Sequence, residues 1–181
     1  MNKGLFLDRD GVINVDRGYV YRIEEFQFVD GIFALCSAFL KCGYQIFVIT
    51  NQSGIARGYY TKEDYDILTS WMLGEFRKMQ IEIIDIYACP YHPDGIVAEY
   101  RKESRDRKPN PGMILKAAEK YNVDLGQSVL IGDRESDIQA GEAAGIRHCF
   151  YFTRDTKIQT TYPVFSSHYE MVQFMREMKT L

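Results

Sequence analysis

The chain has few of the features that mark several common classes of protein. It contains only 4 cysteines in 181 residues, at positions 36, 42, 89 and 149, and their spacing is irregular. None of them begins a Cys-x5-Arg pattern, and no Gly-Lys-Ser/Thr phosphate-binding loop occurs. We therefore expect reduced thiols, which suit the cytosol, with Cys36 and Cys42 buried beside an apolar helix pattern. We also expect chemistry that does not depend on a cysteine nucleophile.

The sequence also lacks long apolar runs, internal repeats and a strong charge of one sign. The only apolar run near the start is 5–7, far short of a signal-peptide core, so we expect a cytoplasmic protein. The formal charge of −3 offers no general attraction for nucleic acid or acidic membranes, and we expect neither as a partner. With 46% hydrophobic residues, the chain can form one domain over residues 1–181, which we expect to be monomeric.

Two acidic clusters follow short apolar strands. Asp8 and Asp10 come after the run 5–7, and alternation along a strand predicts that they share a face while Arg9 points to the other. Asp133 and Asp137 come after a second apolar strand that ends in glycine. Adjacent carboxylates repel each other, so the spacing indicates either a divalent metal site or an acid/base pair. Each cluster alone could also be a solvated turn with a helix cap.

Two further strand ends carry groups that suit an anion. The segment 50–54 follows an apolar strand and offers a hydroxyl, side-chain amides and backbone N–H groups. Arg107 and Lys108 place two positive charges just before a predicted helix. Taken singly, each is as well explained by an ordinary turn or a solvated loop.

Strands and helices alternate along the chain. Strands are predicted at 5–7, 45–49, 81–88, 128–131, 148–152 and 164–165. Helices are predicted at 31–41, 61–79, 111–121 and 136–144, with a closing helix capped near 167–170. This alternation predicts a Rossmann-like, doubly wound parallel sheet of the α/β class. In such sheets ligands bind outside the carboxyl ends of the strands, where all four polar segments fall.

The order Asp-x-Asp, Thr, Lys, Gly-Asp-x-x-x-Asp resembles the haloacid dehalogenase (HAD) superfamily of phosphohydrolases. Segments 8–20, 50–58, 89–93 and 107–112 are similar to its D-glycero-D-manno-heptose-1,7-bisphosphate 7-phosphatase family, and the match spans roughly residues 5–150. The histidinol-phosphate phosphatases are also similar at Asp8 to Asp10, residues 50–52 and 107–109. The resemblance implies a HAD-like fold with no large cap domain.

The resemblance also implies residue roles. Asp8 would be the nucleophile that forms an aspartyl-phosphate, and Asp10 the acid and base. Mg²⁺ would be held by Asp8, Asp133 and the backbone carbonyl of Asp10, consistent with the preference of Mg²⁺ for oxygen ligands. Thr50 and Lys108 would bind the transferring phosphoryl group. The expected contacts to the sugar or its second phosphate are Asp16, Arg17, Gly18, Tyr19, Asn51, Gln52, Ser53, Arg107 and Arg134.

Three functions remain open from the sequence. The first is hydrolysis of a small sugar bisphosphate at position 7. The second is hydrolysis of histidinol phosphate or another small phosphomonoester. The third is a non-enzymatic phospho-acceptor module, and Asp10 argues against it, because an acid beside the nucleophile speeds turnover. Asp137 is expected to cap its helix or hold Lys108.

One departure from the resembling family concerns the loop 89–110. Relatives often carry a structural zinc there, held by Cys-x-His and Cys-x-Cys. This chain keeps Cys89, but Tyr91, Ser104 and Asp106 replace the other three ligands. Structural zinc requires four nitrogen or sulfur ligands, so we expect no structural zinc. Packing, or flexibility of the loop, would take its place.

Overall fold

The computed structural model describes residues 1–155 and 157–177 and contains a central six-stranded parallel sheet. The strands lie in the order β3-β2-β1-β4-β5-β6, and every adjacent pair is parallel. The strands are β1 (Lys3–Leu7), β2 (Tyr44–Asn51), β3 (Ile83–Cys89), β4 (Val129–Gly132), β5 (His148–Phe152) and β6 (Val164–Phe165). Strand order reverses between β1 and β4, so the switch point of the sheet lies between these two strands.

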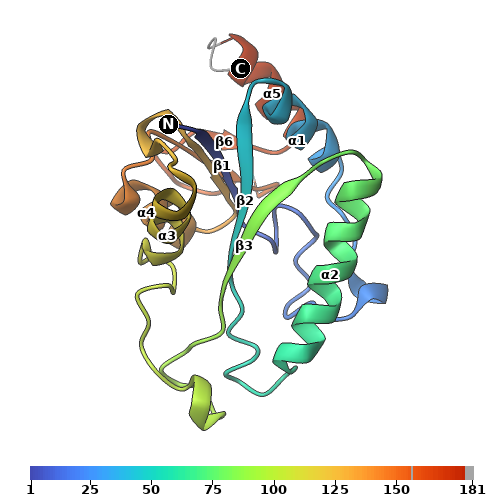
Figure 1. Ribbon diagram of the computed structural model, residues 1–181, viewed down its shortest axis with the longest axis vertical. Coiled ribbons are helices and arrows are strands. Elements are labelled where there is room, and N and C mark those ends of the chain that lie inside the picture. The colour runs from blue at the N-terminus through green and yellow to red at the C-terminus, as the bar shows by residue number, and fades with distance from the viewer. Residues whose placement is uncertain (156, 178–181) are drawn as a thin grey trace.

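Helices cover both faces of the sheet (Figure 1). On one face lie α1 (Ile32–Lys41), α2 (Lys62–Lys78) and α5 (His168–Glu177), and on the other lie α3 (Gly112–Tyr121) and α4 (Glu135–Ala144). Leu5 and Leu7 of β1 pack in the core under the first group, whereas Phe6 packs in the core under the second. Alternate side chains of one strand thus serve two cores, as expected for a sheet buried on both faces.

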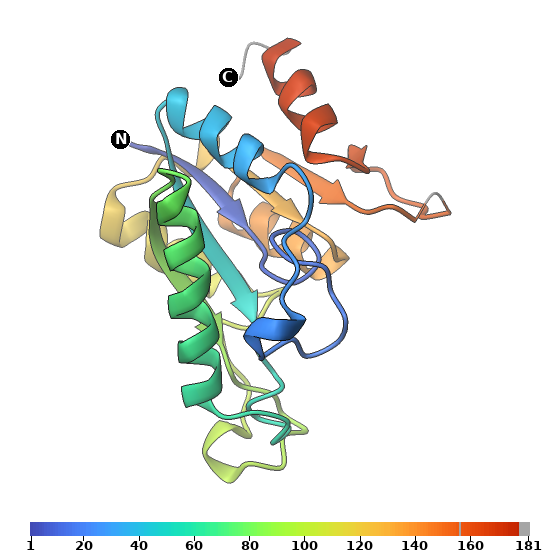
Figure 2. The same cartoon turned by 90° about the vertical axis from the view of Figure 1, so that its right-hand side faces the viewer.

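The carboxyl ends of the strands and the loop 89–110 lie at one end of the molecule (Figure 2). The start of β1 and the helix α5 lie toward the opposite end. α2 begins with a capping box in which Thr61 accepts from the Asp64 N–H and Asp64 accepts from the Thr61 N–H. These two reciprocal bonds satisfy donors at the helix start and fix where α2 begins after the loop 52–61.

The predicted doubly wound parallel sheet is confirmed, and element boundaries shift by a few residues. β1 begins at Lys3 and ends at Leu7, so residues 8–10 lie beyond the strand. The expected alternation therefore fails for Arg9, which is 2% exposed and turns its guanidinium back onto Asp10. Between the described elements there are loops and short 3-10 turns, with no large cap domain in residues 1–155 and 157–177. No helix among these residues combines the length and apolar character needed to cross a membrane.

Candidate active site

The four polar segments predicted from the sequence meet at one cleft of about 460 Å³ at the carboxyl ends of the strands. β1, β2 and β4 are neighbours in the sheet and end close to one another, and Lys108 reaches in from the loop before α3. The residues that line the cleft are Asp8, Asp10, Asp16, Gly18, Tyr19, Asn51, Gln52, Ser53, Tyr60, Arg107, Lys108, Pro109, Arg134, Ser136 and Asp137.

Asp8 and Lys108 form a buried ion pair in the floor of the cleft. Lys108 Nζ lies 3.0 Å from Asp8 Oδ1 and 2.6 Å from Asp137 Oδ1, and it donates to the Ile49 carbonyl at 2.9 Å. Burial disfavours the charge of Lys108, but Asp137 and Asp8 hold the pKa of this amine above its ordinary value. The lysine is therefore a fixed positive charge whose three donors are all engaged.

Asp8 and Asp133 have unusually high proton affinity. Burial raises the pKa of Asp8 to about 7 against the opposing charge of Lys108, and Asp137 adds to the increase. Burial likewise raises the pKa of Asp133 to about 8, with the Asp8 and Asp137 charges as further causes. The positive charge of Lys108 at Asp8, and those of Arg134 and Lys108 at Asp133, oppose these increases without cancelling them. A site with this excess of buried negative charge suits a bound cation.

The carboxylate geometry also fits a metal ion. One oxygen each of Asp8, Asp133 and Asp137 lie within 4.8 Å of one another. Asp133 Oδ1 is buried and has no hydrogen-bond partner among the described residues. Gly11 makes room for Asp133: its φ is +91°, and a Cβ there would lie 2.1 Å from Asp133 Oδ2. Oxygen donors of this kind are the ligands that Mg²⁺ prefers.

Asp10 is held by donors on both of its oxygens. Arg9 donates to both, from Nε at 3.1 Å and Nη2 at 2.8 Å. Asn14 Nδ2 donates to Oδ1 at 3.0 Å, and Gln52 Nε2 donates to Oδ2 at 3.0 Å. Arg9 is fixed in turn because Nη2 also donates to the Val20 carbonyl at 2.7 Å. These bonds fix the orientation of the Asp10 carboxylate at the cleft.

The side-chain amides of Asn51 and Gln52 form hydrogen bonds with residues that are expected to act in catalysis. Asn51 Nδ2 donates to the Lys108 carbonyl at 3.1 Å, and Asn51 Oδ1 accepts from the Lys108 N–H at 3.1 Å. Gln52 Nε2 donates to Thr50 Oγ1 at 2.8 Å as well as to Asp10. Thr50 is 1% exposed and is not itself among the residues that line the cleft. Asn51 and Gln52 thus brace the site across long sequence separations.

Asp137 performs both of the alternatives expected from the sequence. Its Oδ2 accepts from the Arg134 backbone N–H at 2.9 Å, which caps the start of α4. Its Oδ1 faces Lys108 Nζ at 2.6 Å. Gly132 allows this close approach, since a Cβ at that position would lie 2.2 Å from Asp137 Cβ. One carboxylate therefore ties the helix end to the lysine.

Of the residues expected to contact the sugar or its second phosphate, all but Arg17 line the cleft. Arg134 Nη2 and Asp16 Oδ2 pair at 2.9 Å and bridge α4 to the loop after β1. Tyr19 has a φ of +54°, and its ring packs edge-on against Tyr59 at 4.6 Å. Arg17 does not line the cleft, and its guanidinium donates to Gln27 Oε1 at 2.8 Å.

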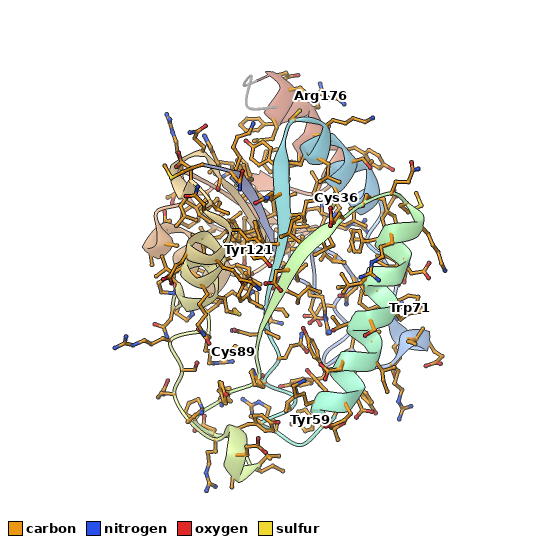
Figure 3. All side chains as sticks on the ribbon, in the orientation of Figure 1. Cys36, Tyr59, Trp71, Cys89, Tyr121 and Arg176 are labelled. Carbon is orange, nitrogen blue, oxygen red and sulfur yellow. The ribbon has the colours of Figure 1, made fainter. Side chains whose placement is uncertain are left out.

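The loop 89–110 brings together Cys89 and the three substituted positions of the expected zinc site. Cys89 is buried at the end of β3 (Figure 3). Burial raises the pKa of Cys89, although Ser104 is close enough to its thiol to oppose this increase by a hydrogen bond. The Asp106 N–H donates to Ser104 Oγ at 3.1 Å. Lys102 Nζ lies 4.1 Å from the centre of the Tyr91 ring. A hydrogen bond thus connects Asp106 to Ser104, and a cation–π contact holds Tyr91 to Lys102 of the same loop.

Several residues of this site are not predictable from the sequence. Arg9 lies with Asp10 and not on the opposite face of the strand, and Asn14 and Tyr60 take part in the hydrogen bonds around Asp10. The Tyr60 hydroxyl donates to Gln52 Oε1, and Tyr60 is 6% exposed. No periodicity or spacing pattern in the sequence predicts these contacts, since they depend on how the loops after β1 and β2 fold over each other.

The chain resembles known proteins in both sequence and fold. A family model described as HAD hydrolase-like matches residues 106–167. A D-glycero-α-D-manno-heptose-1,7-bisphosphate 7-phosphatase of Burkholderia mallei is 54% identical over 145 residues, 80% of this chain and 77% of that protein. The Campylobacter jejuni protein of the same name is 46% identical over 175 residues, 97% of this chain and 96% of that protein. The crystal structure of a D,D-heptose 1,7-bisphosphate phosphatase from B. bronchiseptica, complexed with magnesium and phosphate, matches with a TM-score of 0.82 at 25% identity. That match covers 97% of this chain and 99% of that one.

Proposed function

The chain belongs to the D-glycero-D-manno-heptose-1,7-bisphosphate 7-phosphatase family of HAD-like hydrolases, and from this premise we propose how its residues carry out the reaction. The enzyme is a phosphatase that removes the 7-phosphate of D-glycero-D-manno-heptose 1,7-bisphosphate. The buried contact of Asp8 with Lys108 in the floor of the cleft carries the assignment of Asp8 as the nucleophile.

The reaction proceeds in two steps in this proposal. A carboxylate oxygen of Asp8 attacks the phosphorus, the bond from phosphorus to the sugar O7 breaks, and Asp10 gives a proton to the departing oxygen. Asp10 then takes a proton from water, whose oxygen attacks the phosphorus of the aspartyl-phosphate. Inorganic phosphate leaves and the Asp8 carboxylate is restored. The hydrogen bonds from Arg9, Asn14 and Gln52 fix Asp10 for both proton transfers.

The surrounding charges lower the barrier. Asp8 Oδ1 accepts from the Arg9 backbone N–H at 2.7 Å and faces Lys108 at 3.0 Å, which orients the nucleophile. Lys108 and the Thr50 hydroxyl stabilise the charge on the phosphoryl oxygens. Mg²⁺ would be held by Asp8, Asp133 and the backbone carbonyl of Asp10. When bound, it supplies positive charge that offsets the carboxylates and the phosphoryl oxygens.

The mouth of the cleft supplies the contacts to the rest of the substrate. We propose that Asp16, Arg17, Gly18, Tyr19, Ser53, Arg107 and Arg134 act there, with Arg107 on the second phosphate. Arg107 Nη1 is buried without a hydrogen-bond partner among the described residues, which supports a role for Arg107 in binding an anion. Arg17 would have to leave Gln27 to take part.

We further propose a zinc-free enzyme that acts as a monomer in the cytoplasm, without nucleic acid or a membrane as a partner. Tyr91, Ser104 and Asp106 are poor zinc ligands, and hydrogen bonds and packing connect the loop in their place. The net charge of −3 gives no general attraction for polyanions. The cysteines are free thiols, which supports a reducing compartment.

A comparison of substrates tests the proposal. The kcat/KM of the purified enzyme with Mg²⁺ would be measured on both anomers of the heptose 1,7-bisphosphate, on the matching 7-monophosphate and on histidinol phosphate. A charge-assisted contact to the second phosphate is worth roughly 1.5 to 3 kcal/mol, so the bisphosphate is expected to be preferred by about tenfold to a hundredfold. Equal values for the bisphosphate and monophosphate would contradict the proposal, and faster turnover of histidinol phosphate would favour that substrate instead.

A further inference from the structure

We propose that Gln52 is a positioning residue that orients Asp10 and Thr50 together, and that Tyr60 fixes the orientation of its amide. This inference rests on the roles given to Asp10 and Thr50 in the proposed function. It differs from the expectation for Gln52 drawn from the family resemblance, which was a contact to the sugar. The difference follows from where each hydrogen-bonding group of Gln52 is engaged.

Both N–H groups of the Gln52 amide are occupied inside the protein. Nε2 donates to Asp10 Oδ2 at 3.0 Å and to Thr50 Oγ1 at 2.8 Å. A primary amide has two N–H donors, so none is left for a substrate hydroxyl. The residue borders the cleft but is only 1% exposed. Gln52 is therefore placed to orient the catalytic residues and not to bind the substrate.

Tyr60 and Asp10 together select one orientation of the amide. The Tyr60 hydroxyl donates to Gln52 Oε1, and burial raises the pKa of Tyr60 above its usual range, so this phenol keeps its proton. If the amide were turned over, its oxygen would face the Asp10 carboxylate, and two acceptors would oppose each other. The observed orientation places a donor against Asp10 and an acceptor against Tyr60.

This orientation sets the direction of the neighbouring donors. Because Thr50 Oγ1 accepts from Gln52, the Thr50 hydroxyl proton is free to point toward a phosphoryl oxygen. Asp10 Oδ2 is held between Gln52 Nε2 and Arg9 Nε, at 3.0 Å and 3.1 Å. One amide thus aligns the proton-transfer residue with the phosphoryl-binding hydroxyl, and it does so across 42 residues of sequence from Asp10.

Tyr60 is fixed by tight packing. Its ring stacks on Tyr21 with centroids 5.2 Å apart and an interplanar angle of 11°, and it packs in a small core with Ile55 and Tyr65. A Cβ at Gly54 would lie 2.1 Å from Cε1 of the Tyr60 ring. The absence of a side chain at Gly54 is therefore what lets Tyr60 reach Gln52.

The test compares Gln52→Met and Tyr60→Phe with the matched control Tyr21→Phe, which keeps the aromatic stack and leaves the bonds of Gln52 in place. Steady-state kinetics would be measured on the heptose bisphosphate and on p-nitrophenyl phosphate, a monoester without a sugar. Gln52→Met is expected to lower kcat about tenfold to a hundredfold, the cost of a hydrogen bond to a charged group. Tyr60→Phe is expected to lower it about threefold to tenfold.

The distinguishing result is the split between kcat and KM. A positioning role lowers kcat on both substrates and leaves KM within about threefold. The decrease is expected to be smaller on p-nitrophenyl phosphate, because p-nitrophenolate departs without a proton from Asp10. A rise in KM for the bisphosphate with kcat unchanged would show that Gln52 binds the sugar and would overturn the inference. Wild-type kcat in Tyr60→Phe would overturn the role of Tyr60. The wild-type arm reports separately on the proposed function, because the variant ratios on p-nitrophenyl phosphate do not depend on the heptose.

A second perturbation keeps the inference testable if Gln52→Met fails to fold. Gly54→Ala changes no polar side chain but pushes against the Tyr60 ring. It is expected to lower kcat at least as much as Tyr60→Phe, with thermal unfolding used to confirm that the variant is folded. A folded Gly54→Ala enzyme with wild-type kcat would contradict the proposed connection from Tyr60 through Gln52 to Asp10.

Discussion

Replacing Asp133 by asparagine should stabilise the metal-free protein at pH 8 while abolishing its response to Mg²⁺. Asp133 is a buried carboxylate whose pKa is raised from 3.8 to about 8 by burial and by the charges of Asp8 and Asp137. A buried carboxylate of this kind favours the folded state when protonated and opposes it when ionised. Asparagine has nearly the same shape and carries no charge, so it removes this opposition.

The sign and the pH window follow from the direction of the shift. Because the folded-state pKa lies above the unfolded one, the stabilisation is complete below pH 3.8 and is lost as pH rises through about 8. Each unit of pKa corresponds to 1.36 kcal/mol, so the full shift is on the order of 5 kcal/mol. We expect the metal-free variant to exceed the wild type by about 2 to 5 kcal/mol at pH 8, or roughly 5 to 15 °C in Tm. Near pH 4 the two should be equal.

The assay is thermal unfolding over pH 4 to 9, with EDTA or with Mg²⁺. Mg²⁺ at a hundred times its Kd should stabilise the wild type by about 2.7 kcal/mol, and the effect should grow as pH rises. Asp133→Asn should show no such response. Asp94→Asn is a suitable control, because the Asp94 side chain is 83% exposed. A metal-free Asp133→Asn protein less stable than the wild type at pH 8 would refute this account of the acidic cluster.

The remaining predictions concern the nucleophile, the loop and a buried histidine. Asp8→Asn should abolish turnover in a folded protein, and Asp10→Asn should lower kcat by about 10² to 10⁴, as steady-state assays would show. Near wild-type turnover by Asp8→Asn would rule out this nucleophile. Elemental analysis of protein purified without chelator should find no zinc, and one equivalent per chain would contradict that. Burial lowers the pKa of His168 to about 4. The free energy of unfolding of the wild type, measured in urea, should therefore fall by about 3 kcal/mol between pH 6.5 and pH 4. His168→Gln should not show this decrease. A parallel loss in the variant would exclude His168 as its source.

The sequence predicts the strands and the residues at their ends well, for a physical reason. β1, β2 and β4 are largely apolar and buried. Polar side chains follow β1 and β4 at once and form the last two residues of β2. In a parallel sheet these ends share one edge. Asp8, Thr50 and Asp133 were therefore predictable from order and spacing.

The contacts between loops could not be predicted in this way. Asn51 bonds to Lys108 across 57 residues, and Gln52 bonds to Asp10 across 42. Local propensity has no information about such pairs, so the two amides were expected to face the substrate. Arg9 was misplaced for a different reason, because strand alternation applies only as far as Leu7, where β1 ends. Beyond that point, bonds from Arg9 to the Asp10 carboxylate and the Val20 carbonyl decide where its guanidinium lies.

The position of cleavage tests the central claim most directly. Phosphorus NMR would follow the wild-type enzyme acting with Mg²⁺ on D-glycero-D-manno-heptose 1,7-bisphosphate. The C7 phosphate signal is expected to disappear, with one equivalent of inorganic phosphate released and the C1 phosphate retained. Loss of the C1 phosphate, or no hydrolysis of either anomer, would contradict cleavage at position 7.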